Sequence, residues 1–195
     1  HILLIEKGSI SNHKTHLYIS NKNGQCYDQI EVSTDLLGQR MDFSFHKWNQ
    51  QQKQVKNIKT LNELGCEIKR GIQTHAALKI QNKSFIHTTN LVSNQSISFD
   101  KTVKYKNNKL IFAEKGDILL ARVGRGCIGK ISIVVEGRGL ISDCVYRIRV
   151  PKEFIELVWK SLTSHTGQEW FKANSHGVCA QVISKIDLLN FPIQT

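Results

Sequence analysis

Short runs of apolar and β-branched residues, separated by polar turns, dominate the chain as far as Val150, and such runs are typical of β-strands. The first two, residues 15–20 and 25–32, flank the turn NKNG, whose Asn-Gly pair predicts a tight β-hairpin. From Phe85 onward we expect further strands, joined by basic loops and mostly antiparallel. They are SFIHTTNL, KLIFAEKGDILLARVG, KISIVV and LISDCVYRIRV.

The apolar period changes to that of helices after Pro151. Apolar residues recur at helical spacing in PKEFIELVWKSLTS, and a proline suits the first turn of a helix. A second helix is expected over GQEWFKAN, with Trp170 and Phe171 pointing inward. In SKIDLLNFPI, Ser184 and Asp187 have the spacing of a helix cap, so we expect a short helix there that Pro192 closes.

The segment LNELGCEIKRGIQT has a mixed pattern. Leu61, Leu64 and Ile68 fit one helical face, but Gly65 interrupts it, so we expect a short helical turn that runs into an exposed loop. The whole pattern predicts an α+β fold: a mixed, mostly antiparallel twisted sheet with a C-terminal helical pair and short helices.

The glutamine- and lysine-rich stretch QQQKQVKNIK suits a surface linker or an exposed helix, and it indicates a boundary near residues 48–58. We therefore assign residues 1–50 to a β-hairpin segment with its linker, and residues 51–195 to a second domain. The chain has no initiator methionine and its start has no signal-peptide features, so we interpret it as a piece of a longer protein.

The chain is basic, with 27 Lys and Arg against 16 Asp and Glu, a net charge of +11. The excess is concentrated between Lys101 and Leu140, which is the electrostatic pattern of a protein that binds polyanions. A solvated basic surface is the alternative. The 5 cysteines are scattered and form no C-x-x-C pair, which favours reduced thiols in a cytoplasmic protein over a zinc site or disulfides. No apolar run reaches the roughly 20 residues of a membrane helix.

The stretch GDILLARVGRGCIGKISIVV has G-x-G-x-x-G spacing at Gly124, Gly126 and Gly129. A dinucleotide or S-adenosylmethionine site needs a helix after the third glycine and an acidic residue about 20 positions further on. Here β-branched residues follow the third glycine, and the nearest acidic residues lie at the wrong distance. We therefore expect strand, tight loop and strand, with basic side chains suited to phosphates or a guanine edge. A purely structural hairpin with incidental basic neighbours is the alternative.

Four stretches occur in a recognisable order: LNELGCEIKRGIQT, FIHTTNL, GDILLARVGRGCIGKISIV and GVCAQVISKIDLLNFPI. Their order resembles the target recognition domains of type I restriction–modification specificity subunits. The same domain is fused behind the catalytic part of some adenine-N6 DNA methyltransferases. The resemblance covers about Leu61 to Ile193 and implies a module that reads one short half of a bipartite DNA site from the major groove.

The first 50 residues also take part in this resemblance, since LLGQRMDFSFH is similar to the segment that precedes a recognition domain in a fused methyltransferase. This implies that residues 1–50 are the tail of a catalytic domain. The family's long spacer helix, the second proline common after the FPI motif and a second recognition domain are missing from this sequence.

The function that the resemblance implies is sequence-specific binding of double-stranded DNA for a restriction–modification system. A DNA methyltransferase domain or subunit is the expected partner, and a restriction subunit is a further candidate. S-adenosylmethionine is then a cofactor of the methyltransferase and not of this chain. With only Pro151 and Pro192, the chain lacks the Pro-Pro motif of adenine methyltransferases, so we expect no catalytic or metal-binding residues in it. The alternatives are the C-terminal recognition part of a fused adenine-N6 methyltransferase and a basic module that binds RNA or protein.

The resemblance assigns DNA contact to variable loops, in which Arg suits guanine, Gln and Asn suit adenine, and Lys suits phosphate. The candidates in these loops are Arg70, Gln73, Thr74, His75, Lys79, His87, Thr88, Thr89, Asn90, Arg122, Arg125, Lys130, Lys172, Asn174, Ser175 and His176.

Overall fold

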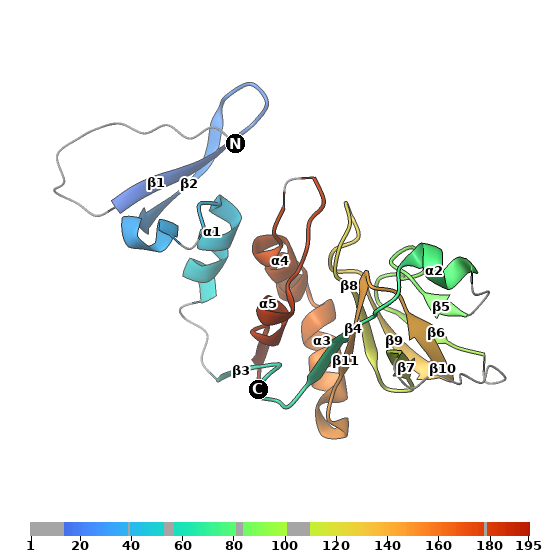
Figure 1. Cartoon of the computed structure of the whole chain (residues 1–195). Coiled ribbons are helices and arrows are strands. Elements are labelled where there is room, and N and C mark those ends of the chain that lie inside the picture. Colours follow the sequence, from blue (N-terminus) through green and yellow to red (C-terminus); the bar gives the residue numbers. More distant parts are fainter. Residues whose placement is uncertain (1–13, 39, 53–56, 81–83, 101–109, 178) are drawn as a thin grey trace. The chain divides into compact units, whose positions relative to one another are not determined.

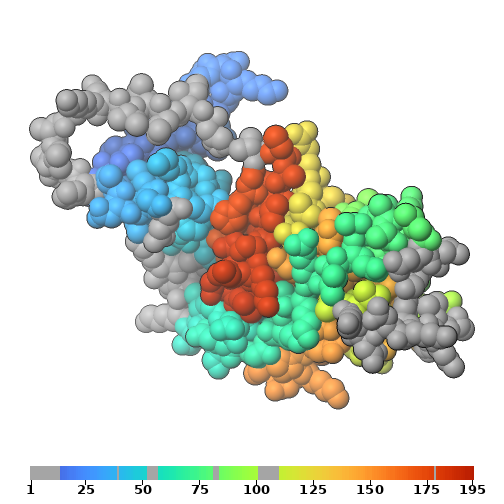
Figure 2. Space-filling view, viewed as in Figure 1, coloured from blue at the N-terminus to red at the C-terminus, as the bar shows by residue number. Residues whose placement is uncertain are grey.

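The computed structural model describes residues 14–38, 40–52, 57–80, 84–100, 110–177 and 179–195. The chain divides into two compact units, His1–Gln54 and Val55–Thr195, which we call the N-terminal unit and the C-terminal unit (Figure 1, Figure 2). Within the described ranges, every helix is too short or too polar to span a bilayer.

The N-terminal unit consists of a β-hairpin, a short 3-10 helix and one α-helix. The two strands pair antiparallel as predicted, and Gly24 in their turn has a φ of 79°, a conformation that favours glycine. Asp42 begins the α-helix, because its Oδ1 accepts a hydrogen bond of 3.0 Å from the backbone N–H of Phe45. The elements are β1 (Lys14–Ser20), β2 (Cys26–Ser33), η1 (Thr34–Gly38) and α1 (Phe43–Gln52). The predicted polar linker thus begins within the last turn of α1, and residues 53–56 lie outside the described ranges.

The C-terminal unit contains a five-stranded sheet in the order β4-β11-β8-β9-β6, a three-stranded sheet β5-β10-β7 and the pair β12-β3. Two of the strand pairs, β6 with β9 and β5 with β10, are parallel, and the remaining pairs are antiparallel. The strands are β3 (Ile58–Thr60), β4 (Glu67–Arg70), β5 (Phe85–Ile86), β6 (Gln95–Ser98), β7 (Phe112–Glu114), β8 (Ile118–Ala121), β9 (Ile131–Glu136), β10 (Arg138–Ile141), β11 (Val145–Arg149) and β12 (Pro192–Gln194). The predicted mixed, mostly antiparallel α+β fold is confirmed.

Helices cover one face of the five-stranded sheet, and the three-stranded sheet lies against the other (Figure 1). All four residues of β8 are buried, as expected for a strand covered on both faces. Between the two sheets, Leu119, Val134 and Ile141 belong to one apolar cluster with Phe99. A Cβ on Gly139 would lie 1.9 Å from the Phe99 ring, so this glycine is required for the close packing of the two sheets.

The predicted helical pair and the short capped helix are confirmed. Trp170 and Phe171 are buried, and Ser184 Oγ accepts a 3.0 Å hydrogen bond from the backbone N–H of Asp187. Pro192 does not simply close that last helix, since it begins β12, which pairs with β3. The helices of this unit are α2 (His75–Ile80), η2 (Lys152–Phe154), α3 (Ile155–Thr163), α4 (His165–Asn174) and α5 (Lys185–Leu189).

The segment after Leu61 differs from the prediction. A helical turn does form, with the backbone N–H of Leu64 donating to Thr60 O at 3.0 Å, but β4 comes between this turn and the expected loop, which is confined to residues 71–74. Gly65, with a φ of 73°, ends the turn, and the chain then forms β4 with Ile68 buried in the sheet. The short helix α2 follows where a loop was expected. Elements of 4 and 6 residues are too short for hydrophobic periodicity to identify them.

The stretch LISDCVYRIRV, predicted as one strand, forms two strands in different sheets. β10 belongs to the three-stranded sheet and β11 to the five-stranded sheet. A turn at residues 142–144 separates them, with the backbone N–H of Val145 donating to Ser142 O at 3.0 Å. Because apolar residues lie on both sides of the turn, the sequence pattern predicted one continuous strand. It did not indicate that the chain passes from the three-stranded sheet to the five-stranded sheet at this point.

Candidate nucleic-acid interface

Seven of the sixteen predicted contact residues lie at one end of the five-stranded sheet. At this end β4 finishes at Arg70 and β8 finishes at Ala121, while β9 begins at Ile131 and β11 begins at Val145. We call it the hairpin end, and we include in it the turns that adjoin these four strand ends. In Figure 1 it is the upper end of the C-terminal unit, where the β8–β9 loop lies beside the loop that precedes α5.

The glycine-rich segment is a β-hairpin, as predicted. β8 and β9 pair antiparallel on either side of it, so a strand follows Gly129 where a dinucleotide site would need a helix. Gly124, Gly126 and Gly129 have φ values of 133°, 69° and 81°, so all three adopt conformations that disfavour other residues. The hairpin holds Arg125 exposed at its tip.

The turn between β10 and β11 holds two arginines in place through Asp143. Arg70 donates from Nε to the Asp143 backbone oxygen at 2.9 Å, and its Nη2 lies 3.6 Å from the Asp143 carboxylate. Arg122 donates from Nη1 to the same backbone oxygen at 3.4 Å and lies over the Tyr146 ring at 5.5 Å. Two planar guanidinium groups from different strands are thereby brought to one turn.

The loop before α5 is attached to the glycine hairpin by backbone hydrogen bonds. Gly124 donates to Gln181 O at 3.1 Å, and Ile183 donates to Arg122 O at 2.9 Å. Across the same loop, His176 and Val182 exchange backbone bonds of 2.8 Å in both directions. The hairpin end therefore includes part of the loop before α5, where the last group of DNA contacts was predicted.

Two histidines complete the hairpin end. The rings of His75 and His87 stack with centroids 4.4 Å apart, and His87 Nδ1 lies 2.7 Å from Ser142 Oγ. Burial lowers the pKa of His87 below its ordinary value, and the charge of His75 lowers it further. Since Nδ1 contacts Ser142, Nε2 is the other ring nitrogen of His87 that can take part in a hydrogen bond.

Two buried polar atoms at this end have no hydrogen-bond partner among the described residues. They are Gln73 Oε1 and Arg122 Nε. The backbone oxygen of Gln73 accepts a 2.9 Å bond from the Asp143 N–H, so the main chain of this residue is held in place while its side-chain acceptor is unsatisfied. Buried polar groups are rarely left unpaired in native proteins, and Trp48 Nε1 and Arg147 Nε are two further described examples away from this end.

Several of the predicted residues are used inside the protein. Thr88 and Ser175 are buried, and Thr74 Oγ1 caps α2 by accepting from the Ala77 N–H at 3.2 Å. The remaining internal contacts are a 2.9 Å bond from the His87 N–H to Asn90 Oδ1, a 3.0 Å bond from Asn174 Nδ2 to Trp170 O, a 2.7 Å ion pair between Lys172 and Glu169 and a 2.9 Å contact between His176 Nε2 and Asp187.

The predicted contact residues that belong to the segments of the hairpin end are Arg70, Gln73, His75, His87, Arg122, Arg125 and Lys130. Lys79 on α2 and Thr89 after β5 are exposed. Sequence reasoning missed Asp143 as the residue that orients two arginines. The signal in the sequence that could have identified it is an acidic residue within LISDCVYRIRV, a stretch otherwise typical of one continuous strand.

The basic segment from Lys101 to Leu140 is divided by the structure. Lys101, Lys104, Lys106 and Lys109 lie outside the described ranges. Arg138 is at the opposite end of the fold, 3.3 Å from Glu114. Of this segment, the described residues that supply positive charge to the hairpin end are Arg122, Arg125 and Lys130.

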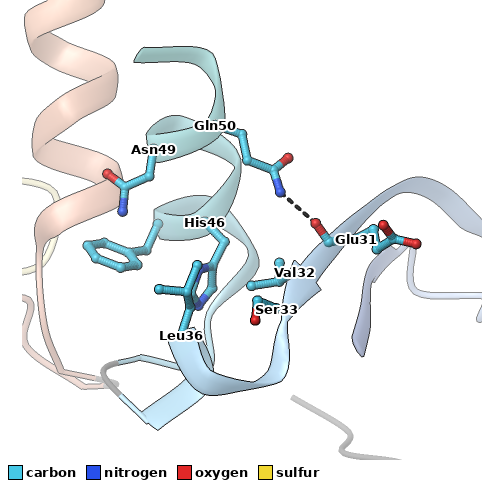
Figure 3. A pocket seen from close by; sticks show the side chains of 8 residues that line it. Glu31, Val32, Ser33, Leu36, His46, Asn49 and Gln50 are labelled. Carbon is cyan, nitrogen blue, oxygen red and sulfur yellow. Dashed lines mark hydrogen bonds between the residues drawn. The ribbon is translucent and has the colours of Figure 1, made fainter. Parts of the chain in front are cut away.

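The N-terminal unit has a small hollow between β2, η1 and α1 (Figure 3). Gln50 Nε2 donates to Glu31 O at 2.6 Å across one side of it, as the dashed line shows. None of the predicted contact residues lines it. The lining residues are Glu31, Val32, Ser33, Leu36, Phe45, His46, Asn49 and Gln50.

No protein-family model matches the sequence, and no curated protein matches it. Solved structures do match. The type IIG restriction endonuclease BpuSI matches with a TM-score of 0.57 and 8% identity, over 86% of this chain and 28% of the BpuSI chain. The specificity subunit of the type I restriction–modification system from M. genitalium matches with a TM-score of 0.44 and 15% identity, over 72% of this chain and 34% of that chain. The HsdS subunit from Thermoanaerobacter tengcongensis matches with a TM-score of 0.40 and 15% identity, over 71% and 33%.

The match to BpuSI shows a shared fold. This chain spans only 28% to 34% of the lengths of these three solved chains. The BpuSI match covers 86% of 195 residues, about 168, and the C-terminal unit from Val55 to Thr195 has 141, so the match extends into the N-terminal unit.

Proposed function

We propose that the C-terminal unit binds double-stranded DNA sequence-specifically and reads a short half-site for a restriction–modification system. The observation that carries the proposal is the pair of guanidinium groups, Arg70 and Arg122, held by the turn at Asp143 beside the exposed Arg125. Arginine side chains can donate two parallel bonds to guanine O6 and N7 in the major groove. Because their contacts with Asp143 already restrict two of the three, binding costs them less side-chain entropy.

The other groups at the hairpin end suit the same function. Lys130 and Arg125 can contact phosphates, which sets the affinity and its dependence on salt. Gln73 through its amide N–H groups and His87 through Nε2 can form hydrogen bonds with base edges. The glycines of the hairpin allow its backbone to approach the DNA closely.

The comparisons support this proposal at the level of the fold. BpuSI is a restriction endonuclease by its published description, and its fold is shared by this chain. The order of the four sequence motifs adds the resemblance to target recognition domains. The proposed partners are a DNA methyltransferase domain or subunit and a restriction subunit.

A second candidate function is that of the C-terminal recognition part of a fused adenine-N6 DNA methyltransferase. The first 50 residues favour it, because LLGQRMDFSFH is similar to the segment that precedes a recognition domain in a fused methyltransferase. The N-terminal unit would then be the tail of a catalytic domain that binds S-adenosylmethionine. The sequence upstream of His1 tests this candidate, since it should contain a cofactor motif and a Pro-Pro motif.

The test of DNA recognition is a selection of preferred sites from a library of random duplexes, followed by affinity measurements over a salt series. We expect one enriched motif, bound at least a hundredfold more tightly than a scrambled duplex at physiological salt. Salt-labile binding without an enriched motif would exclude specific readout. Tighter binding of RNA than of duplex DNA would indicate an RNA-binding module instead.

A matched pair of variants separates base readout from charge. Arg122→Lys keeps the positive charge but loses the planar fork, so we expect it to relax the base preference at one position by about tenfold. Lys130→Arg keeps the charge at a neighbouring position and should leave the enriched motif unchanged. An unaltered motif in Arg122→Lys would remove Arg122 from the set of base-reading residues.

A further inference from the structure

Ile72 is an apolar side chain in an unusual position. It is 61% exposed, and it stands between Arg70 and Gln73, two of the residues that gather at the hairpin end. Single exposed apolar residues are common on protein surfaces and need no explanation by themselves. The surroundings of Ile72 make it different.

The backbone on both sides of Ile72 is fixed. The Gly71 N–H donates to Val145 O at 3.2 Å, and Gln73 O accepts a 2.9 Å bond from the Asp143 N–H. A Cβ on Gly71 would lie 2.2 Å from the backbone oxygen of Ser142, so the chain passes against the β10–β11 turn with no room to move inward. An isoleucine has few side-chain rotamers, so Ile72 presents its methyl groups to solvent in a nearly fixed direction.

We infer that Ile72 contacts the C5-methyl group of a thymine in the major groove. This inference rests on the proposed function of the C-terminal unit. Thymine is the base that presents an apolar group in the major groove, and apolar side chains recognise it by burying that methyl group. Arg70 and Gln73 beside Ile72 supply hydrogen-bonding groups for neighbouring base edges, so a rigid apolar group between them adds a contact that neither can make.

The experiment uses the full chain and the duplex enriched in the selection described above. Each thymine is replaced in turn by deoxyuridine, which removes the methyl group and keeps base pairing. We expect one replacement to weaken binding about fourfold, the value of one buried methyl group. In Ile72→Ala the same replacement should have no effect, because the partner of the methyl group is already missing.

Ile186→Ala is the matched control, since Ile186 on α5 is also exposed, at 72%. It should keep the full sensitivity to deoxyuridine. A second variant, Ile72→Ser, should behave as Ile72→Ala does, and thermal unfolding of each variant verifies that it folds.

The outcomes separate this inference from the function on which it rests. An enriched site in which no deoxyuridine replacement matters overturns the role of Ile72 and leaves specific DNA binding intact. Equal sensitivity in wild type and Ile72→Ala also overturns it, because another residue, such as the exposed Val92, then contacts the methyl group. If no site is enriched, both the proposed function and the inference fail.

Discussion

The two ends of the five-stranded sheet carry charged residues in contrasting arrangements. At the end opposite the hairpin, Asp117 is buried and accepts two 2.8 Å bonds from Arg149, while Arg147 pairs with Glu67. The Asp117 hydrogen bond and charge raise the pKa of Arg149 above its ordinary value. At the hairpin end, Arg70 and Arg122 both contact the turn at Asp143. The described ion pair there joins Arg70 to the Asp143 carboxylate.

This difference indicates that the same strands serve two purposes. At the opposite end Arg149 and Arg147 are each paired with a carboxylate of the protein, although Arg147 Nε is buried without a partner among the described residues. The hairpin end leaves positive charge without matching carboxylates, which suits an anionic partner. Three predictions test this distinction, and the first has the largest expected effect.

Removal of the buried carboxylate at the opposite end should destabilise the fold without changing DNA recognition. Asp117→Ala leaves Arg149 without its bidentate partner and the Glu114 N–H without its 2.8 Å acceptor. Arg149 is partly exposed and recovers some hydration, so we expect a loss of about 2–3 kcal/mol in the free energy of unfolding. Urea denaturation measures it. Asp117→Asn, which keeps an acceptor, should lose less, and a changed base preference in either variant would contradict the separation of the two ends.

Reversal of charge should affect DNA binding at the hairpin end only. Arg125→Glu places a carboxylate on the exposed tip of the glycine hairpin, and we expect about tenfold weaker binding to every duplex at low salt. The slope of log affinity against log salt should fall by about one for the lost phosphate contact. Lys115→Glu makes the corresponding change in an exposed turn at the opposite end. Equal losses in the two variants would show that net charge alone governs binding.

The two ends should also respond to different ranges of pH. The pKa of His87 is lowered from 6.5, chiefly by burial, so the native state binds fewer protons there than the unfolded chain. Its contribution to stability is present above pH 6.5 and declines as the pH falls below that value. The pKa of Glu67 at the opposite end is lowered from 4.5, chiefly by the hydrogen bond from Lys69, so its contribution is lost only at more acidic pH.

Thermal unfolding between pH 8 and pH 5 measures the contribution of His87, which is the smallest of the three effects. His87→Gln should show a flatter dependence of stability on pH over this range. His165→Gln, on the exposed surface of α4, should keep the dependence of the wild type. An unchanged slope in His87→Gln would show that this imidazole does not couple folding to protons.

Local sequence signals predicted those elements whose pattern is long or whose turn chemistry is specific. The Asn-Gly hairpin, the amphipathic α3 and the Ser184 cap follow directly from neighbouring residues. The elements that were missed include β3, β4, β6, β12 and α2, together with the division of β10 from β11. They are short, and long-range pairing stabilises them, as in the bonds of β4 to β11, which lies more than 70 residues away.

The candidate site shows the same division. The sequence indicated the glycine hairpin with Arg122 and Arg125, because glycine spacing and β-branched residues are visible locally. It did not indicate that Asp143 orients Arg70 and Arg122, since these residues come from three separate segments. Thr88 and Ser175, predicted as contacts, proved to be buried, and burial depends on packing that no local pattern records.

The sequence alone determined the basic character of the chain, its fold class and the conversion of the glycine spacing into a hairpin. These properties depend on composition and on the conformational preferences of adjacent residues. Only the tertiary structure decided which arginines are paired with carboxylates and which are left for a partner. The pairing depends on the register between strands, which brings Arg149 to Asp117 at one end and Arg70 to Asp143 at the other, while Arg125 is exposed on the β8–β9 hairpin.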